Sequence, residues 1–176
     1  MKPRPDLRIV ANSLLRDLPM LQGRCIFVDN FGRSESVASN SMAVRDCIRW
    51  MRRGGALLTF PAGEVAHLYF KDGIIADPPW NPTAARIAQI AGAAAVPVFF
   101  QGANSPAFHF AGAIHPVLRT ASLGREFLNK RGQTVKARIG RTISAETLRR
   151  FDDPAEAAEY LRCRTYLLEP PSRPDE

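Results

Sequence analysis

The amino-acid sequence predicts an α/β fold, in which strands and helices alternate along a single domain. The first observation is that short apolar runs alternate with longer segments whose apolar residues recur at helical spacing. The second is the composition: 176 residues, 45% hydrophobic and 23% charged, without a low-complexity tract or an internal repeat. A chain of this size and composition is long enough to bury a core of its own.

The first elements are predicted to be strands. The runs "LRIVAN" (7–12) and "RCIFVD" (24–29) have the length and apolar content of strands. One turn of helix is expected between them, around Leu14 to Leu18. The run "ALLTF" (56–60) is apolar enough to be a strand buried on both faces.

The stretch "SNSMAVRDCIRWMRRGG" (39–55) is predicted to be a helix that ends at Gly54 or Gly55. Its apolar residues follow the spacing i, i+3, i+4, i+7, namely Val44, Cys47, Ile48 and Met51. The opposite side carries three arginines at helical spacing: Arg45, Arg49 and Arg52. An anionic lipid surface or an acidic acyl carrier protein is one interpretation of this arginine face, and an ordinary solvated helix face is the other.

A second helix is predicted over "WNPTAARIAQIAG" (80–92), because both of its ends carry the expected signals. Asn81 is a suitable N-cap residue, and Pro82 stands at the first helical position. Gly92 follows the last turn, where a residue with positive φ commonly ends a helix.

The remaining elements complete one domain over residues 1–168. The run "AAVPVFFQG" (94–102) is predicted to be a strand, and Pro97 favours a sheet edge or a bulge. Beyond it we expect a helix over 106–112, a helix over 122–129, a strand "QTVKARIG" (133–140) and a helix from Pro154. The tail "EPPSRPDE" (169–176) is expected to be disordered.

The formal charge of +7 (24 basic against 17 acidic residues) indicates an anionic partner. Nucleic acid, anionic lipid headgroups and an acidic carrier protein all fit, and charge alone does not choose between them. A basic protein with no anionic partner is the remaining interpretation. Nucleic acid is disfavoured, because the sequence has no stacking-aromatic motif, no zinc spacing and no recognition-helix pattern.

The cysteines and the apolar runs point to a reducing, cytoplasmic location. Cys25, Cys47 and Cys163 are odd in number, far apart and outside any CxxC pair, so neither a disulfide framework nor a metal site is expected. The longest apolar stretch, "AGAAAVPVFF", is about half as long as a bilayer crossing requires. The first residues, "MKPRPDLR", lack the apolar region of a signal peptide.

His67 and Asp72 resemble a catalytic base and the acid that orients it, but the local sequence favours a structural role. "AHLYF", "KDG" and "IIAD" form the pattern of a β-hairpin with Asp72-Gly73 in its turn. Asp72 then belongs to the turn, and His67 stands at the start of a hairpin strand. We therefore interpret the pair as structural.

Three blocks of sequence occur in an order that is typical of one enzyme family. They are "GRCIFVDN" (23–30), "FPAGEV" (60–65) and "VPVFFQG" (96–102). With these blocks the chain resembles the phospholipid/glycerol acyltransferases (PlsC-like), over about Leu7 to Tyr166. It is most similar to the bacterial branch labelled hemolysin, some of whose members acylate lyso-ornithine lipid. The resemblance implies a central mixed, mostly parallel sheet flanked by helices.

The chain also departs from the family pattern. The family's first block, a His-x4-Asp box that supplies the catalytic base, should precede "LRIVAN" by a few tens of residues, and only six residues do. All three histidines (His67, His109 and His115) follow the second block. We therefore expect no catalytic residue in this chain, an N-terminally incomplete domain, and no activity of the chain by itself.

In the other blocks, single residues differ from the family pattern. Asn30 replaces the arginine of the second block, with Arg33 three residues on. Ala62 replaces the glutamate of the third block, and Glu64 its threonine.

What the resemblance leaves in place is a binding site for the acceptor headgroup. We expect that site at Arg33, Phe60, Pro61, Gly63 and Glu64. The turn at 61–63 would offer backbone N–H groups to an anion, and Arg33 a charge-assisted hydrogen bond. Glu64 has two equally supported interpretations. Either it holds a basic residue or the acceptor hydroxyl in place, or it is an ordinary solvated carboxylate.

The resemblance implies transfer of a fatty acyl group from an acyl thioester to the hydroxyl of a lysolipid. The acceptor is lysophosphatidic acid, another lysophospholipid or lyso-ornithine lipid, and the donor is acyl-CoA or an acyl carrier protein. No metal or further cofactor is expected, and the domain would bind peripherally at the inner face of the cytoplasmic membrane. The alternative is a non-catalytic module that binds a lipid headgroup or an acyl carrier.

Overall fold

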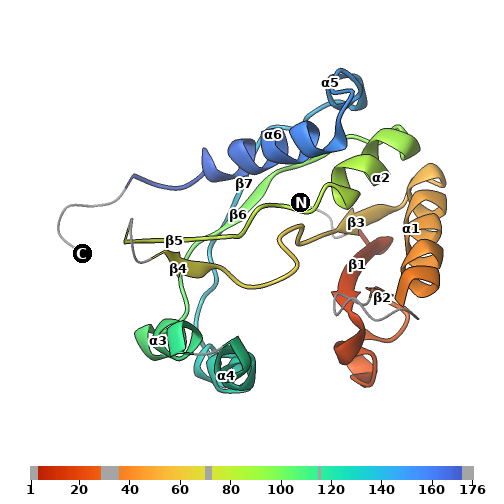
Figure 1. The fold of residues 1–176 in the computed structure, drawn as a ribbon. Coiled ribbons are helices and arrows are strands. Elements are labelled where there is room, and N and C mark those ends of the chain that lie inside the picture. The colour runs from red at the N-terminus through yellow and green to blue at the C-terminus, as the bar shows by residue number, and fades with distance from the viewer. Residues whose placement is uncertain (1–3, 29–35, 70–72, 115, 172–176) are drawn as a thin grey trace.

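The computed structural model describes residues 4–28, 36–69, 73–114 and 116–171 and confirms the α/β class (Figure 1). The strands are β1 (Leu7–Asn12), β2 (Cys25–Val28), β3 (Ala56–Leu58), β4 (His67–Tyr69), β5 (Ile74–Ala76), β6 (Val98–Phe100) and β7 (Ala137–Ile139). The α-helices are α1 (Ser36–Arg52), α2 (Thr83–Ala91), α3 (Pro106–Ile114), α4 (Pro116–Asn129), α5 (Ala145–Arg149) and α6 (Pro154–Tyr166). Two short 3₁₀ helices, η1 (Ser13–Leu15) and η2 (Pro19–Leu21), lie between β1 and β2.

The central sheet has the strand order β2-β1-β3, and both of its strand pairs are parallel. In register, Ile9 of β1 lies opposite Cys25 of β2, and Leu7 lies opposite Ala56 of β3. Two antiparallel pairs, β4 with β5 and β6 with β7, complete the strands of the described residues. The mostly parallel, mixed arrangement that the resemblance implied is therefore confirmed.

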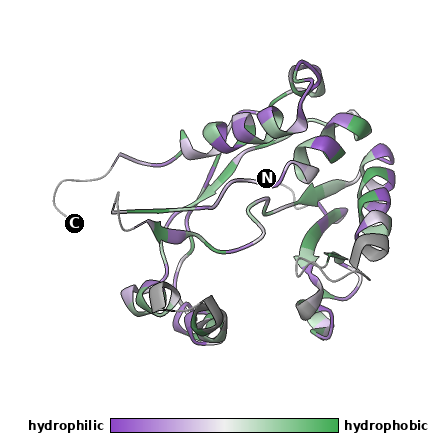
Figure 2. Cartoon of the chain, in the orientation of Figure 1, coloured by the Kyte–Doolittle hydropathy of each residue, from purple (hydrophilic) through white to green (hydrophobic). Residues whose placement is uncertain are grey.

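Helix α1 covers the central sheet and forms the first part of the core. The buried residues there are Ile26, Ala43, Cys47 and Ile87. The predicted apolar stripe of α1 packs at this place, since Val44, Ile48 and Met51 lie against the buried cluster. Burial raises the pKa of the Cys47 thiol to about 11, so this thiol stays protonated and packs as an apolar group. Figure 2 shows the strands of the sheet as hydrophobic, whereas α1 carries hydrophilic and hydrophobic turns.

The second part of the core joins α2 to α5 and α6. Small residues meet there, with Ala85 of α2 against Ala157 and Ala158 of α6, all at most 3% exposed. Beside them, Leu148 of α5 is fully buried. The Gln89 side chain of α2 donates to the backbone carbonyls of Leu148 and Phe151, at 2.9 and 3.0 Å. Small side chains let the helix backbones approach closely, and the amide fixes their relative position.

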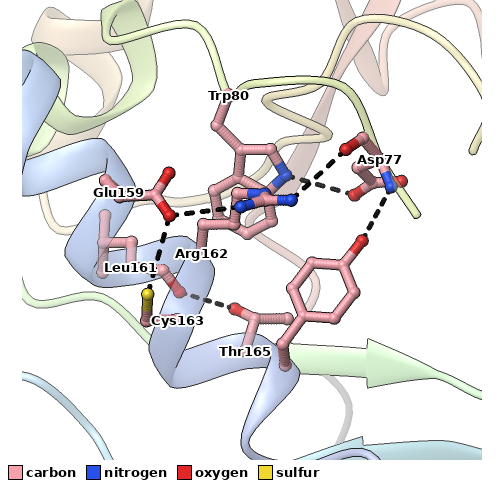
Figure 3. A network of polar contacts seen from close by, with 8 residues as sticks. Asp77, Trp80, Glu159, Leu161, Arg162, Cys163 and Thr165 are labelled. Carbon is pink, nitrogen blue, oxygen red and sulfur yellow. Dashed lines mark hydrogen bonds and ion pairs between the residues drawn. The ribbon is translucent and has the colours of Figure 1, made fainter. Parts of the chain in front are cut away.

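A polar network ties the end of β5 to α6 (Figure 3). The Asp77 N–H donates to the Tyr166 hydroxyl at 2.8 Å, and the Trp80 indole donates to the Asp77 carboxylate at 3.1 Å. Arg162 donates to the Asp77 carbonyl at 3.4 Å and to the Glu159 carboxylate at 3.1 Å. A shallow hollow of about 290 Å³ borders this network between the β4–β5 hairpin and α6.

Helices α3 and α4 form a hairpin at one end of the molecule, apart from α2, α5 and α6 (Figure 1). Glu126 of α4 joins α4 to the residue that precedes α3. The Glu126 carboxylate accepts from the backbone N–H of Ser105 at 3.0 Å and from the Ser105 hydroxyl at 2.5 Å. The same hydroxyl accepts from Phe108 N–H at 3.3 Å, so Ser105 also caps the start of α3. These hydrogen bonds hold the pKa of the Glu126 carboxyl below its usual range.

Some expected details of strands and caps differ in the structure. β3 ends at Leu58, and its three residues are only partly buried, so the expectation of a strand over 56–60 buried on both faces is wrong. Among the described strands, β3 pairs with β1 alone, so it lies at an edge of the sheet. Pro82 occupies the N-cap position of α2, and the Asn81 side chain accepts from Thr83 N–H at 2.9 Å.

Other expectations are confirmed. Gly92 ends α2 with a left-handed backbone (φ 66°). Among the described strands, β6 pairs with β7 alone, which agrees with the edge position that Pro97 favoured. The disorder expected of the tail (169–176) stays a prediction. Glu169 N–H donates to the Tyr166 carbonyl at 2.9 Å, and residues 172–176 lie outside the described residues.

Gly55 is expected to be intolerant of a side chain. The Trp50 indole donates to the carbonyls of Asp6 and Ala56 at 3.1 and 3.2 Å, and the Arg8 guanidinium lies 3.8 Å from its ring centre. A Cβ at Gly55 would overlap this fixed ring. Gly55→Ala should therefore lower the free energy of unfolding by about 1–3 kcal/mol, measured by denaturant titration.

Gly124→Ala is the matched control for that change. Gly124 lies inside α4, and a Cβ there meets nothing within 4 Å. Alanine is the better helix former, so this change should be neutral or stabilising by up to about 1 kcal/mol. Equal effects of the two substitutions would contradict the assigned role of Trp50.

Glu126→Gln is expected to reduce the sensitivity of the fold to acid. The folded state lowers the pKa of this carboxyl, so the stabilisation is present above the ordinary value of 4.5 and is lost as the pH falls through the lowered value. The variant should have a lower Tm than the wild type at pH 7, and the difference should shrink toward pH 3. The exposed Glu156→Gln on α6 is the control. A constant difference in Tm across this range would contradict the assignment.

Candidate functional site

The carboxyl ends of β1, β2 and β3 lie along one edge of the central sheet. The strands are parallel, so the chain leaves Asn12, Val28 and Leu58 at the same edge. α1 connects β2 to β3 and runs antiparallel to them, which brings its N-terminus, with its partial positive charge, to this edge. In open α/β sheets, ligands bind in the crevice outside the carboxyl ends of the strands.

A tight turn follows β3 at this edge. The Gly63 N–H donates to the Phe60 carbonyl at 3.0 Å, which defines a β-turn with Pro61 at its second position. Positive φ is confined to glycines in the described part of the chain, and Gly63 has φ 72°. The turn is therefore of type I, which favours Pro at its second position and Gly at its fourth. Asn81 N–H donates to the Pro61 carbonyl at 2.9 Å and fixes the turn to the segment before α2.

An exposed aromatic pair flanks the turn. The rings of Phe60 and Phe100 lie 6.3 Å apart, and these residues are 56% and 46% exposed. Phe100 is the last residue of β6, so the pair joins the "FPAGEV" and "VPVFFQG" blocks in space. Within the "GRCIFVDN" block, Cys25–Val28 forms β2, on the far side of β1 from β3. The edge therefore presents a turn and an apolar platform next to each other.

The headgroup residues predicted from sequence are brought together only in part. Phe60, Pro61, Gly63 and Glu64 all lie in or directly after the turn. The prediction for Arg33 falls within 29–35, outside the described residues.

The structure pairs His67 with Glu64. Its Nε2 lies 3.3 Å from the Glu64 carboxylate, with the histidine side chain 22% and the glutamate side chain 48% exposed. Sequence reasoning missed this pair, although a spacing of three residues next to a turn was the available signal. The predicted hairpin is confirmed, since His67 of β4 lies opposite Ala76 of β5. Asp72, which the sequence analysis considered together with His67, lies outside the described residues.

The other histidines lie elsewhere. His109 is buried in α3, where its ring packs edge-on against Phe108 and its Nε2 has no hydrogen-bond partner among the described residues. His115 lies outside the described residues.

Within residues 4–28, 36–69, 73–114 and 116–171, no three His, Cys, Asp or Glu side chains gather closely enough to hold a metal ion. None of the helices described there has the length and apolar run that a bilayer crossing needs.

Comparison with known families identifies the class of protein. The fold is an α/β domain whose candidate site lies at the carboxyl ends of parallel strands, and a family model described as acyltransferase matches residues 3–172. The match covers nearly the whole chain, and this protein belongs to that acyltransferase family. The acyltransferase resemblance is therefore confirmed, while the narrower PlsC-like branch stays a prediction. No curated protein and no solved structure gives a significant match.

The Glu64–His67 pair is expected to contribute little to stability. Both groups are partly exposed to water, which screens their attraction. A double-mutant cycle of Glu64→Gln and His67→Asn should give a coupling of about 0.2–1 kcal/mol by denaturant unfolding. The exposed Glu146–Arg150 pair of the α5 region is the control and should lie at the low end. A coupling above about 2 kcal/mol would contradict this estimate for a partly exposed pair.

Proposed function

We propose that this domain binds a lysolipid acceptor for fatty acyl transfer from an acyl thioester. The acceptor is a lysophospholipid or lyso-ornithine lipid, and the donor is acyl-CoA or an acyl carrier protein. Membership of the acyltransferase family supports the reaction class. The observation that carries the acceptor is the turn of Phe60 to Gly63 beside the exposed Phe60–Phe100 pair, because such a site suits a polar headgroup next to an acyl chain.

The reaction needs a base that this chain does not supply in the expected place. The acceptor hydroxyl oxygen attacks the thioester carbonyl carbon, the C–S bond breaks, and the thiolate takes up a proton. A base that removes the hydroxyl proton contributes about 10²–10⁴-fold to such a step. None of the three histidines precedes the second block, where the resemblance places the base. We therefore propose that residues 1–176 bind the acceptor without turning it over.

His67 does not replace that base in this proposal. It lies after the turn, on the first strand of a hairpin, and its Nε2 faces Glu64. Arg33 instead supplies the positive charge for the headgroup, while the turn residues Phe60, Pro61 and Gly63, with Glu64 after them, form the rest of the proposed site. The domain acts at the inner face of the cytoplasmic membrane, where lysolipid acceptors reside.

Acceptor binding tests the proposal directly. A short-chain lysophosphatidic acid below its critical micelle concentration is titrated calorimetrically into the wild type and into Arg33→Gln. Loss of a charge-assisted hydrogen bond should weaken binding about tenfold or more. Arg149→Gln, an exposed arginine of α5, is the matched control and should bind as the wild type does. Equal affinities of the Arg33 and Arg149 variants would overturn the assignment of Arg33.

A turnover assay separates binding from catalysis. The chain is incubated with palmitoyl-CoA and lysophosphatidic acid or lyso-ornithine lipid, and release of free thiol is followed. We expect no rate above a control without protein. Clear turnover that His67→Asn abolishes would overturn the proposed inactivity. The absence of binding to either lipid would overturn the acceptor itself.

A further inference from the structure

Nearly all of the net charge of the chain is concentrated in one segment. Residues 101–143 contain seven basic residues and one acidic residue, Glu126. The basic residues are Arg119, Arg125, Lys130, Arg131, Lys136, Arg138 and Arg141. Since the formal charge of the whole chain is +7, the rest of the sequence is close to neutral. The segment consists of the α3–α4 hairpin and the strand that returns from it.

The single carboxylate of this segment is held inside the hairpin and not on its outer surface. Glu126 is 7% exposed, and both of its oxygens accept hydrogen bonds from Ser105 at the base of the hairpin. Arg125 and Arg131, in contrast, are exposed. Lys130 is partly occupied, because its ammonium donates to the Ala103 carbonyl at 2.6 Å. The exposed surface of the hairpin is therefore basic.

The same hairpin exposes large apolar side chains. Phe127, Leu128 and Phe110 are 79%, 68% and 67% exposed. The buried side of the hairpin is already formed by other residues, with Phe108 of α3 at 1% exposure. Apolar groups on the outer side of a helix are not needed for its packing, and together with basic residues they are typical of a helix that lies in a membrane interface.

We propose that the α3–α4 hairpin docks this domain on an anionic lipid bilayer. Phe110, Phe127 and Leu128 enter the boundary between headgroups and acyl chains, while Arg125 and Arg131 contact the anionic headgroups. The inference rests on the membrane location proposed above and names the surface responsible for it. Figure 1 shows the hairpin at one end of the molecule, where it can reach a surface ahead of α2, α5 and α6.

The apolar residues favour a bilayer over an acidic carrier protein or a second copy of the chain. A carrier protein would be recognised through its carboxylates, which leaves side chains as exposed as Phe127 without a role. A second copy would bring its own basic hairpin against this one, and like charges would oppose the contact.

The test is co-sedimentation with vesicles of phosphatidylcholine, with and without 30% phosphatidylglycerol. The apolar variant is Phe127→Gln with Leu128→Gln, and the charge variant is Arg125→Gln with Arg131→Gln. Their matched controls belong to other elements than the hairpin: Met20→Gln of η2, whose side chain is as exposed as that of Phe127, and Arg149→Gln with Arg150→Gln at α5. Unchanged circular dichroism and Tm confirm that each variant is folded.

We expect the wild type to bind the anionic vesicles much more tightly than the neutral ones, and to lose binding at high salt. Each arginine removed from the hairpin should weaken binding about fivefold, and the apolar variant should weaken it tenfold or more. The controls should bind as the wild type does.

Three outcomes would overturn the inference. The first is equal binding of vesicles by the hairpin variants and their controls. The second is equal binding of the wild type to neutral and anionic vesicles. The third is that the wild type binds no vesicles but self-associates or binds a carrier protein, and that the hairpin variants abolish this association. The inference and the proposed acceptor fail separately. If the chain binds vesicles but not lysophosphatidic acid, the proposed docking surface stands and the proposed acceptor is overturned. If it binds lysophosphatidic acid but not vesicles, only the docking surface is overturned.

Discussion

The parallel pairing of β1 with both β2 and β3 is the constraint on which the rest of the domain depends. Parallel neighbours cannot be joined by a tight turn, so the chain must cross from the end of β2 back to the start of β3. α1 makes that crossing and covers the sheet as it does so, with Cys47 at 1% exposure in the shared core. The carboxyl ends of the strands and the N-terminus of α1 therefore meet at one edge, and that edge is the candidate site.

The start of β1 is fixed by contacts that lie far from the site. Arg4 pairs with Asp6 and donates to the Gly54 carbonyl at 2.8 Å, directly after α1. Trp50 donates to the carbonyls of Asp6 and Ala56, so one indole joins the starts of β1 and β3. These contacts set the register of β1 against β3 at one end of the sheet, and the turn after β3 inherits its position from that register.

The sequence predicted those elements that depend on residues close together in the chain. The apolar stripe of α1, the end of α2 at Gly92 and the hairpin of β4 and β5 each depend on residues within a few positions. The pairing of β6 with β7 joins residues about 40 positions apart, and spacing within one strand carries no information about its partner. α5 (Ala145–Arg149) was missed because five residues are too short for a periodic pattern, although Ser144 caps it.

The candidate site was predictable to the same extent. The turn at Pro61 to Gly63 carries its own signal, because proline and glycine occupy the positions that a type I turn favours. The contact of Phe60 with Phe100 and the pairing of Glu64 with His67 depend on how separate segments are placed. Phe60 lies in the turn after β3 and Phe100 at the end of β6. These residues have no sequence relation to each other, so only the fold reveals the apolar side of the site.

Positive charge is distributed unevenly between the body of the domain and the α3–α4 hairpin, which is the surface proposed for an anionic partner. Two arginines of the predicted α1 face have intramolecular partners: Arg49 pairs with Asp46 at 2.8 Å, and Arg52 donates to the Ile90 carbonyl at 3.1 Å. The body of the domain is thus close to neutral, and the positive charge that remains lies on the α3–α4 hairpin and its return strand. Basic side chains that make no contact within the fold remain available to an anionic partner. Because the exposed apolar side chains of α4 lie on the same hairpin, charge and hydrophobicity favour the same surface for contact with lipid.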